Sequence, residues 1–298
     1  MQAHVPATVI PCMAWLAAHL LPAFDWLVTL GIGIVVTAAG VLLFRQASKG
    51  GVLFALALFT AETGTLVAIR ALIAAGASTR WQYIMPFALV LVPALYVAFI
   101  LTRLRRWRRA GFTHPRGWRA PQAAVPLLAT LALPAVGLWG RGAIPMVALI
   151  LALQVVFMLI DVFMEEATYR GLIFDAIDHL PVNQRVLMAS LLFGLSHIDN
   201  LFLPAVDEIG VLYQVFEATL IGILFTAVRL RMNAIWPVML AHAAYNFMLI
   251  LAFGHASPVT PTLPGFIVVT AVNLSLALVG LGLLRRMPAP ARALQAAA

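Results

Sequence analysis

The segment "FMEEATYRGLIFD", residues 163–175, places three ionisable side chains beside some of the most apolar sequence in the chain. On a helix each residue advances by about 100°, so Glu166 and Arg170, four residues apart, share a face and can pair. Glu165 is rotated by about 140° from Arg170. We therefore expect Arg170 to hold Glu166 while Glu165 stays available for chemistry. The alternative is that all three cap the cytoplasmic end of a helix in headgroup water.

A histidine ends the apolar run in "FGLSHIDN", residues 193–200. Phe193 lies one helical turn before His197, and Asp199 and Asn200 follow, where they could orient the ring or line a loop. Taken alone, a histidine on an apolar face is more simply explained as a hydrogen-bonded core residue. The segment therefore indicates a functional site only together with other polar groups at membrane depth.

A second histidine lies in "HAAYN", residues 242–246, inside a segment that carries no charged residue. His242 and Asn246 are four residues apart and therefore share one helix face. Polar groups inside a membrane helix must face protein, water or substrate rather than lipid. We expect this face to line a cavity.

Glu165, His197, His242 and Asn246 together suit two kinds of chemistry. A bound Zn²⁺ could take Glu165, His197 and His242 as ligands. Alternatively, a glutamate–histidine pair activates water directly, while the second histidine and the asparagine donate hydrogen bonds to an oxyanion. Both would hydrolyse an acyl bond. The HExxH zinc motif and the Gly-x-Ser-x-Gly nucleophile motif are absent from the sequence.

The composition predicts that these residues sit in a membrane protein. The chain has 298 residues, of which 63% are hydrophobic and only 10% are charged, and its mean hydropathy is +1.00. A soluble domain of this length cannot bury so much apolar surface, so we expect an all-α, polytopic transmembrane helical bundle. Cys12 is the only cysteine, which excludes an intrachain disulfide and a zinc–thiolate cluster.

Eight or nine membrane spans are expected, because one of the apolar segments, at 186–197, is short. A mixed stretch at 167–180 is expected to be an amphipathic or re-entrant helix. The apolar segments are Trp26–Phe44, Val52–Ala75, Tyr83–Leu101, Ala123–Trp139, Ala143–Phe163, Val186–His197 with its extension, Ile209–Val228, Ala234–Phe253 and Phe266–Leu284.

The net charge of +8 comes almost wholly from arginine, with Lys49 as the only lysine. The arginines cluster at the ends of apolar segments, which favours lipid headgroups over nucleic acid as their partner. The loop "RLRRWRRAGFTHPRGWR", residues 103–119, carries seven arginines and should be cytoplasmic. Counting spans from this loop predicts an N-out, C-in arrangement, with only Arg80 and Arg141 outside.

The acidic residues are concentrated in the second half, where nine of the eleven lie between Asp161 and Glu217. Intramembrane ionisable groups usually mark function, so the chemistry is expected between residues 160 and 250. Asp161 lies one turn before Glu165 and either repels its charge or points to solvent. Glu217 is expected to line the cavity. Glu62 and Arg70 share a face of the second span and are expected to neutralise each other through neighbours.

Three motifs, taken in this order, resemble those of the CPBP family: Glu-Glu-x-x-x-Arg at 165–170, Phe-x-x-x-His at 193–197 and His-x-x-x-Asn at 242–246. This family comprises the CAAX prenyl proteases and bacteriocin-processing intramembrane proteases and is also known as the Abi family. The similarity covers about residues 143–255. It implies an all-helical bundle whose cavity opens to the cytoplasmic side.

The resemblance also implies a role for each motif residue. Glu165 and His197 would activate water, and His242 and Asn246 would polarise the scissile carbonyl. The supporting residues would be Glu166, Arg170 and Phe193. Both a metal-dependent and a metal-independent glutamate mechanism are argued for the family, so no cofactor is assigned and Zn²⁺ or another divalent metal stays the alternative.

Three regions are expected on this basis: N-terminal transmembrane helices of unassigned role at 1–140, a CPBP-like catalytic core at 141–256, and a final transmembrane helix with a short cytoplasmic tail at 257–298. The expected function is that of an intramembrane endopeptidase acting on a membrane-associated protein or peptide. The content of Ala, Leu and Arg is typical of bacteria, most of which lack prenylated proteins. A leader peptide, an anti-sigma factor or another membrane protein in the bacterial cytoplasmic membrane is therefore the expected substrate.

Two other functions stay open. Buried Glu, His and Arg side chains also build proton relays, so a proton-coupled transporter is one alternative, although no internal repeat links the two halves of the chain. The other is a catalytically silent membrane scaffold or immunity protein that keeps the family fold.

Overall fold

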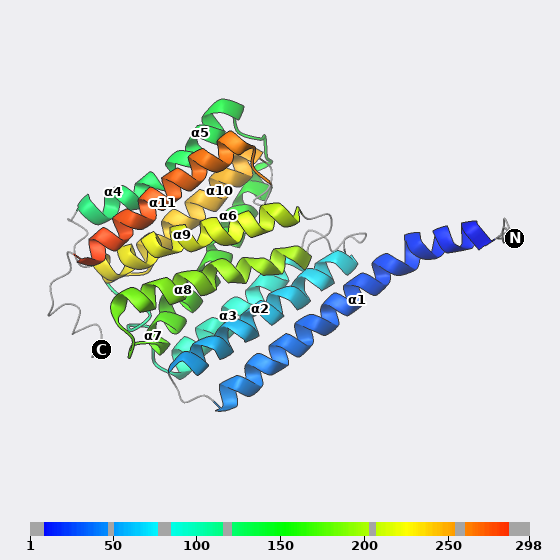
Figure 1. Cartoon of the computed structure of the whole chain (residues 1–298), viewed down its shortest axis with the longest axis horizontal. Helices are drawn as coiled ribbons and strands as arrows, with labels where there is room; N and C mark the ends of the chain where they lie inside the picture. Colours follow the sequence, from blue (N-terminus) through cyan, green and yellow to red (C-terminus); the bar gives the residue numbers. More distant parts are fainter. Residues whose placement is uncertain are drawn as a thin grey trace, which may run out of the picture.

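The computed structural model describes residues 9–46, 51–76, 85–115, 121–202, 207–253 and 260–285, and within these ranges the regular structure is helical, without a strand (Figure 1). The all-α prediction is confirmed. The helices are α1 (Val9–Gln46), α2 (Gly51–Gly76), α3 (Met85–Arg103), α4 (Pro121–Ala129), α5 (Ala132–Arg141), α6 (Ala148–Glu166), η2 (Ala167–Ile173), α7 (Phe174–Ala176), α8 (Val182–Ser196), η3 (His197–Phe202), α9 (Glu208–Met232), α10 (Trp236–Phe253) and α11 (Leu263–Arg285).

Seven helical segments among the described residues are long and apolar enough to cross a membrane. The polytopic bundle is therefore confirmed, and the two remaining apolar segments of the sequence form α3 and the 15-residue α8. The seven segments are Trp26–Phe44, Val52–Leu72, Gln122–Arg141, Ala148–Ala176, Glu208–Met232, Trp236–Phe253 and Leu263–Arg285.

The helices pack side by side in a bundle in which α8 and α9 lie centrally (Figure 1). α1 packs along α2, and α3 packs against α6; α8 packs against α9, α9 against α11, and α10 against α5 and α6. The α1–α2 contact is close because small residues meet there: a Cβ added at Gly40 would lie 2.4 Å from the backbone nitrogen of Ala61. Small residues allow this close approach of membrane helices.

The stretch after Glu166 differs from the amphipathic or re-entrant helix that we expected. α6 continues without a break into the π-helical turn η2, all seven residues of which are buried, and then into α7. A π turn inserts an extra residue and so rotates the side chains that follow. Because η2 lies in the middle of the bundle, it is covered on all sides, and a helix in that position need not be amphipathic.

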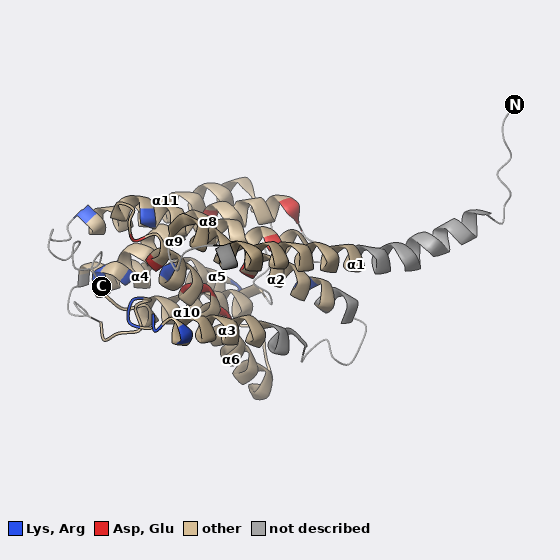
Figure 2. Cartoon of the chain, turned by 90° about the horizontal axis from the view of Figure 1, so that it is seen from below, with Lys and Arg blue, Asp and Glu red and all other residues tan. Residues whose placement is uncertain are grey.

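One end of the bundle gathers the arginines, and we refer to it as the arginine-rich end (Figure 2). The backbone N–H of Ile235, at the start of α10, donates to the Gly111 carbonyl in the basic loop at 2.8 Å. Arg229, near the end of α9, donates to the carbonyl of Arg109 in the same loop. Asn233 then ends α9 in the left-handed conformation, with φ 53°. The loop, the end of α9 and the start of α10 therefore lie together.

Candidate active site

The predicted pair between Glu166 and Arg170 is present in the structure. The two side chains are joined at 3.0 Å between Glu166 Oε1 and Arg170 Nη1, and both are fully buried. The guanidinium carbon of Arg170 also lies 3.8 Å from the ring centroid of Phe193, so this ring covers the buried cation. Phe193 thus packs on the site from α8.

His242 is held between the two glutamates of the first motif. Its Nδ1 lies 2.9 Å from Glu166 Oε1, the same oxygen that pairs with Arg170. Its Nε2 lies 3.7 Å from Glu165 Oε2, which is too long for a direct hydrogen bond. An imidazole anchored at one nitrogen by a carboxylate presents the other nitrogen in a fixed direction. Here that direction is toward Glu165.

Glu165 has fewer hydrogen-bond partners than Glu166. Its Oε2 is buried and has no hydrogen-bond partner, although 17% of its side chain is exposed. A buried polar atom without a partner is costly in a native structure and requires an explanation. The Nε2 atom of the His242 ring lies 3.7 Å from this oxygen. This arrangement leaves an acceptor for a water or a substrate proton.

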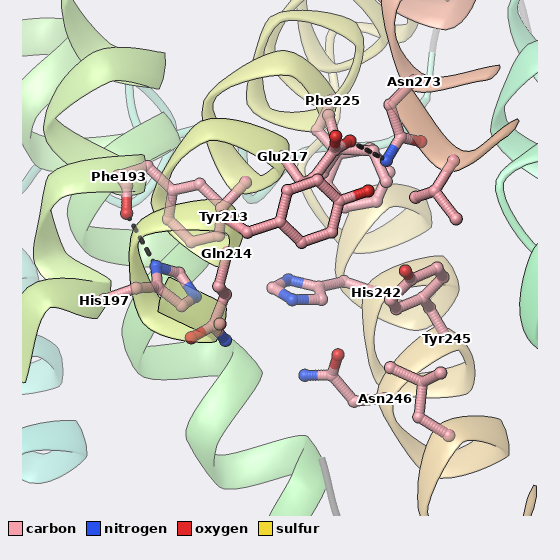
Figure 3. A pocket seen from close by; sticks show the side chains of 15 residues that line it. Phe193, His197, Tyr213, Gln214, Glu217, Phe225, His242, Tyr245, Asn246 and Asn273 are labelled. Atoms are coloured by element: carbon pink, nitrogen blue, oxygen red, sulfur yellow. Dashed lines mark hydrogen bonds between the residues drawn. The ribbon is translucent and has the colours of Figure 1, made fainter. Parts of the chain in front are cut away.

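His197 approaches from the C-terminal end of α8. Its Nδ1 lies 2.9 Å from the carbonyl oxygen of Phe193, and its ring meets the Phe193 ring edge-on, at 4.9 Å between centroids. When Nδ1–H donates to this carbonyl, Nε2 is left as an acceptor. Figure 3 shows the two histidine rings turned toward each other across a cavity, with the Asn246 carboxamide pointing into the same space.

This cavity, which we refer to as the histidine cavity, has a volume of about 300 Å³. Of the residues singled out in the sequence, His197, His242, Asn246, Phe193 and Glu217 line it, whereas Glu165 lies beside it, against the His242 ring. No hydrogen bond joins Glu165 to His197. The full lining is Phe193, His197, Gly210, Tyr213, Gln214, Glu217, Ala218, Ile221, Phe225, His242, Tyr245, Asn246, Leu249, Val269 and Asn273.

Glu217 lines the cavity as expected, and α11 holds it there. Thr270 Oγ1 donates to Glu217 Oε1 and Asn273 Nδ2 donates to Glu217 Oε2, each at 2.6 Å. The sequence reasoning missed both donors. The signal available was that Thr270 and Asn273 are two of only three polar residues, with Ser275, in the otherwise apolar segment 266–284.

Two further polar contacts at the site were not foreseen. Asn200 Nδ2 donates to Gln214 Oε1 at 2.7 Å, which ties the segment after His197 to the cavity wall on α9. Arg70 Nε donates to Asp199 Oδ2, also at 2.7 Å, so Asp199 is a direct partner of Arg70. That Glu62 and Arg70 neutralise each other through neighbours stays a prediction.

The side chains of the described residues are not arranged to coordinate a metal ion. Among them, no group of three or more His, Cys, Asp or Glu side chains is arranged to hold one. His242 directs its two nitrogens at Glu166 and Glu165, and His197 faces it from the other side of the cavity (Figure 3). The set Glu165, His197 and His242 therefore does not converge on one point, and no step through a metal is derived.

The fold and the site define a membrane-embedded helical protein whose carboxylates and imidazoles meet inside the bundle. Residues 146–248 match the family model of the Rce1-like type II CAAX prenyl endopeptidases. The match contains all three motifs and confirms the resemblance to the CPBP family. It supports a CAAX-type intramembrane protease in general terms. No curated protein matches the chain significantly.

Proposed function

We propose that this protein is an intramembrane endopeptidase that hydrolyses a peptide bond in a membrane-associated protein or peptide. The observation that carries the proposal is the position of His242, which is anchored at 2.9 Å by Glu166 and faces Glu165 with its other nitrogen. The Rce1-like match over residues 146–248 supports the same class of reaction.

The proposed oxyanion contact requires both nitrogens of His242 to donate. Two carboxylates, Glu165 and Glu166, meet one guanidinium, Arg170, at the centre of the bundle. Buried charges are tolerated when they are paired and hydrogen-bonded. As an imidazolium, His242 can donate from both of its nitrogens. Nδ1–H then donates to Glu166, and Nε2–H is available to a substrate oxygen.

In this mechanism Glu165 accepts a proton from water, with His197 Nε2 as a second acceptor that orients the water. The water oxygen attacks the carbonyl carbon and forms a tetrahedral intermediate. His242 and Asn246 donate hydrogen bonds to the oxyanion. Glu165 then passes its proton to the amide nitrogen, the carbon–nitrogen bond breaks, and the products are a carboxylic acid and an amine.

Glu166, Arg170 and Phe193 act by positioning. Glu166 and Arg170 fix the His242 ring through a shared carboxylate oxygen, and Phe193 covers the Arg170 guanidinium. None of the three touches the reacting atoms in this scheme. Their loss should therefore act through the orientation of His242 and through stability.

The test compares the membrane proteomes of cells that carry the wild-type protein, Glu165→Gln or Glu208→Gln. Glu208 is an exposed glutamate at the start of α9 and provides a control with the same change of charge. A membrane protein that accumulates uncut only with Glu165→Gln would support the proposal and reveal a substrate. Identical proteomes with folded Glu165→Gln and wild-type protein would contradict it.

A further inference from the structure

A second cavity lies between α1, α2, α3 and η2, and we refer to it as the Glu62 cavity. Its volume is about 240 Å³, close to the lower end of the range for small-molecule sites in proteins. It shares no lining residue with the histidine cavity. The lining is Thr37, Val41, Leu58, Ala61, Glu62, Thr65, Val92, Pro93, Tyr96, Val97, Ile100 and Thr168.

Glu62 is the charged residue of this lining, and it lies where a carboxyl group is costly. It is the eleventh of the 21 residues in the span Val52–Leu72, so it is placed near the middle of the membrane. Only 9% of the residue is exposed. Ionisable groups at this depth are rare, face the interior of a bundle or a cavity, and usually mark function.

Neither carboxyl oxygen of Glu62 has a hydrogen-bond partner among the residues that the structure describes. The hydroxyls of Thr168 and Tyr169 on η2 lie near it, but they make no hydrogen bond of normal geometry with it and are themselves unpaired. The hydroxyls of Thr37 and Thr65 instead donate to carbonyls of their own helices at 2.7 Å. A buried polar group without a partner requires an explanation, and a ligand in the cavity would supply one.

The surroundings of Glu62 favour a cationic partner. Asp161 and Asp199 add negative potential at this carboxyl group, and Asp199 directly binds Arg70, the arginine on the same helix as Glu62. Within the described ranges no salt bridge reaches Glu62. Because a buried carboxylate is tolerated when it is paired, a ligand with a positive charge would stabilise it most.

The mouth of the Glu62 cavity lies on the outer surface of the bundle, where α1, α2 and α3 run side by side (Figure 1). Val41 on α1 and Val92 and Tyr96 on α3 are exposed there, whereas Ile100 and Thr168 are buried. A molecule dissolved in the bilayer could therefore enter sideways between α1 and α3. Its apolar body would contact aliphatic side chains while its polar end reached Glu62.

We propose that the Glu62 cavity binds a lipophilic amine, that is, a small molecule with an amine head on an apolar body. The ammonium group pairs with the Glu62 carboxylate and donates a further hydrogen bond to the Thr168 hydroxyl. The apolar body packs against Leu58, Val97 and Ile100. This site is independent of the proposed function, because none of its lining residues takes part in the hydrolytic mechanism.

Photo-crosslinking in liposomes tests the proposal without requiring any cleavage. The purified full-length protein is placed in phosphatidylcholine liposomes, whose lipid has no primary amine, and irradiated with a decylamine derivative that carries a diazirine in its chain. Proteolysis and mass spectrometry locate the adducts. Unlabelled decylamine, decanol and decanoic acid serve as competitors. Wild type is compared with Glu62→Gln and with the exposed control Glu208→Gln.

The expected result is a set of adducts on peptides from α1, α2 and α3 that decylamine displaces and that decanol and decanoic acid do not. Glu62→Gln should weaken binding by about ten- to hundredfold, the effect of losing a hydrogen bond to a charged group, and Glu208→Gln should bind as wild type does. Three outcomes would overturn the proposal: equal binding by folded Glu62→Gln and wild type, equal displacement by the amine and the alcohol, or adducts spread evenly over all spans.

A steric variant keeps the proposal falsifiable if Glu62→Gln does not fold. Val41→Trp places a large side chain at the mouth of the cavity, and Val35→Trp makes the same change at an exposed position of α1 outside the lining. Loss of the displaceable adducts with Val41→Trp alone is expected. Equal adducts with both tryptophan variants would show that the amine binds elsewhere.

Discussion

Arg70 on α2 pairs with Asp199 on η3, with 2.7 Å between Arg70 Nε and Asp199 Oδ2. Asp199 is almost fully buried and lies two residues after His197. α2 lies outside residues 146–248, over which the Rce1-like model matches. A helix from the N-terminal region thus contacts the segment that carries one of the two cavity histidines, and we propose that this is one role of residues 1–140.

Arg70→Gln should therefore lower the cleavage rate by displacing His197. The buried Asp199 carboxylate would lose a charged partner, which costs about 1–3 kcal/mol. Thermal unfolding in detergent and the cleavage rate together check this expectation. Partial recovery in the double variant Arg70→Gln/Asp199→Asn would show that the unpaired carboxylate is the cause. A single Arg70→Gln variant with wild-type stability and rate would contradict the role given to α2.

Glu166→Gln should destabilise the protein strongly. The substitution leaves the fully buried Arg170 without its carboxylate, and breaking a buried ion pair by removing one partner costs about 3–5 kcal/mol. It also weakens the anchor on His242 Nδ1. Unfolding in a mild detergent with increasing denaturant measures the effect, with the exposed Glu208→Gln as its control. Equal unfolding midpoints for these two variants would argue against a structural role for the Glu166 carboxylate.

Asn246→Ala should lower kcat by about 10²–10³-fold, the usual effect of removing one oxyanion donor. Because the Asn246 side chain is only partly buried and makes no hydrogen bond within the part of the chain that the structure describes, thermal stability should change little. Steady-state kinetics on the purified variant separates kcat from KM. An unchanged kcat with a raised KM would place Asn246 in substrate binding only.

Metal chelation should leave the activity unchanged. The described residues hold no cluster of three metal ligands, and His242 directs its nitrogens at two carboxylates. Purified protein is dialysed against a strong chelator, and activity and elemental content are measured before and after. One bound zinc ion per chain whose removal abolishes cleavage, with recovery on adding zinc back, would refute the metal-free mechanism.

Stability at acid pH should depend on Asp207, just before α9. Hydrogen bonds from the Thr260 side chain and then from the Gly210 N–H lower the pKa of this carboxyl below its ordinary value. A carboxyl with a lowered folded-state pKa contributes stability above its unfolded pKa and loses it as the pH falls through the folded value. The difference in unfolding temperature between wild type and Asp207→Asn should thus shrink as the pH falls below about 4. A difference that is constant from neutral to acid pH would exclude this linkage.

The sequence predicted those parts of the site that depend on one helix. Glu166 and Arg170 are four residues apart, and this spacing alone brings them together once the helix forms. The apolar spans likewise follow from segment length and composition. Both are local properties, and the structure agrees with them.

Contacts between distant helices could not be predicted in this way. His242 meets Glu166 across 76 positions, and Arg70 meets Asp199 across 129. Their contact depends on how the helices cross and on the π turn after Glu166, which rotates the residues that follow. Spacing along the chain carries no information about either, so Asp199 could not be predicted as the partner of Arg70.

The central claim is that Glu165 activates the attacking water. The most direct measurement is kcat/KM for cleavage of a substrate found by the proteome comparison, using purified wild type, Glu165→Gln and Glu208→Gln in proteoliposomes. The account predicts a fall of about 10²–10⁴-fold for Glu165→Gln, the range expected for loss of a general base, and wild-type kinetics for Glu208→Gln. Cleavage by folded Glu165→Gln at the wild-type rate would contradict it.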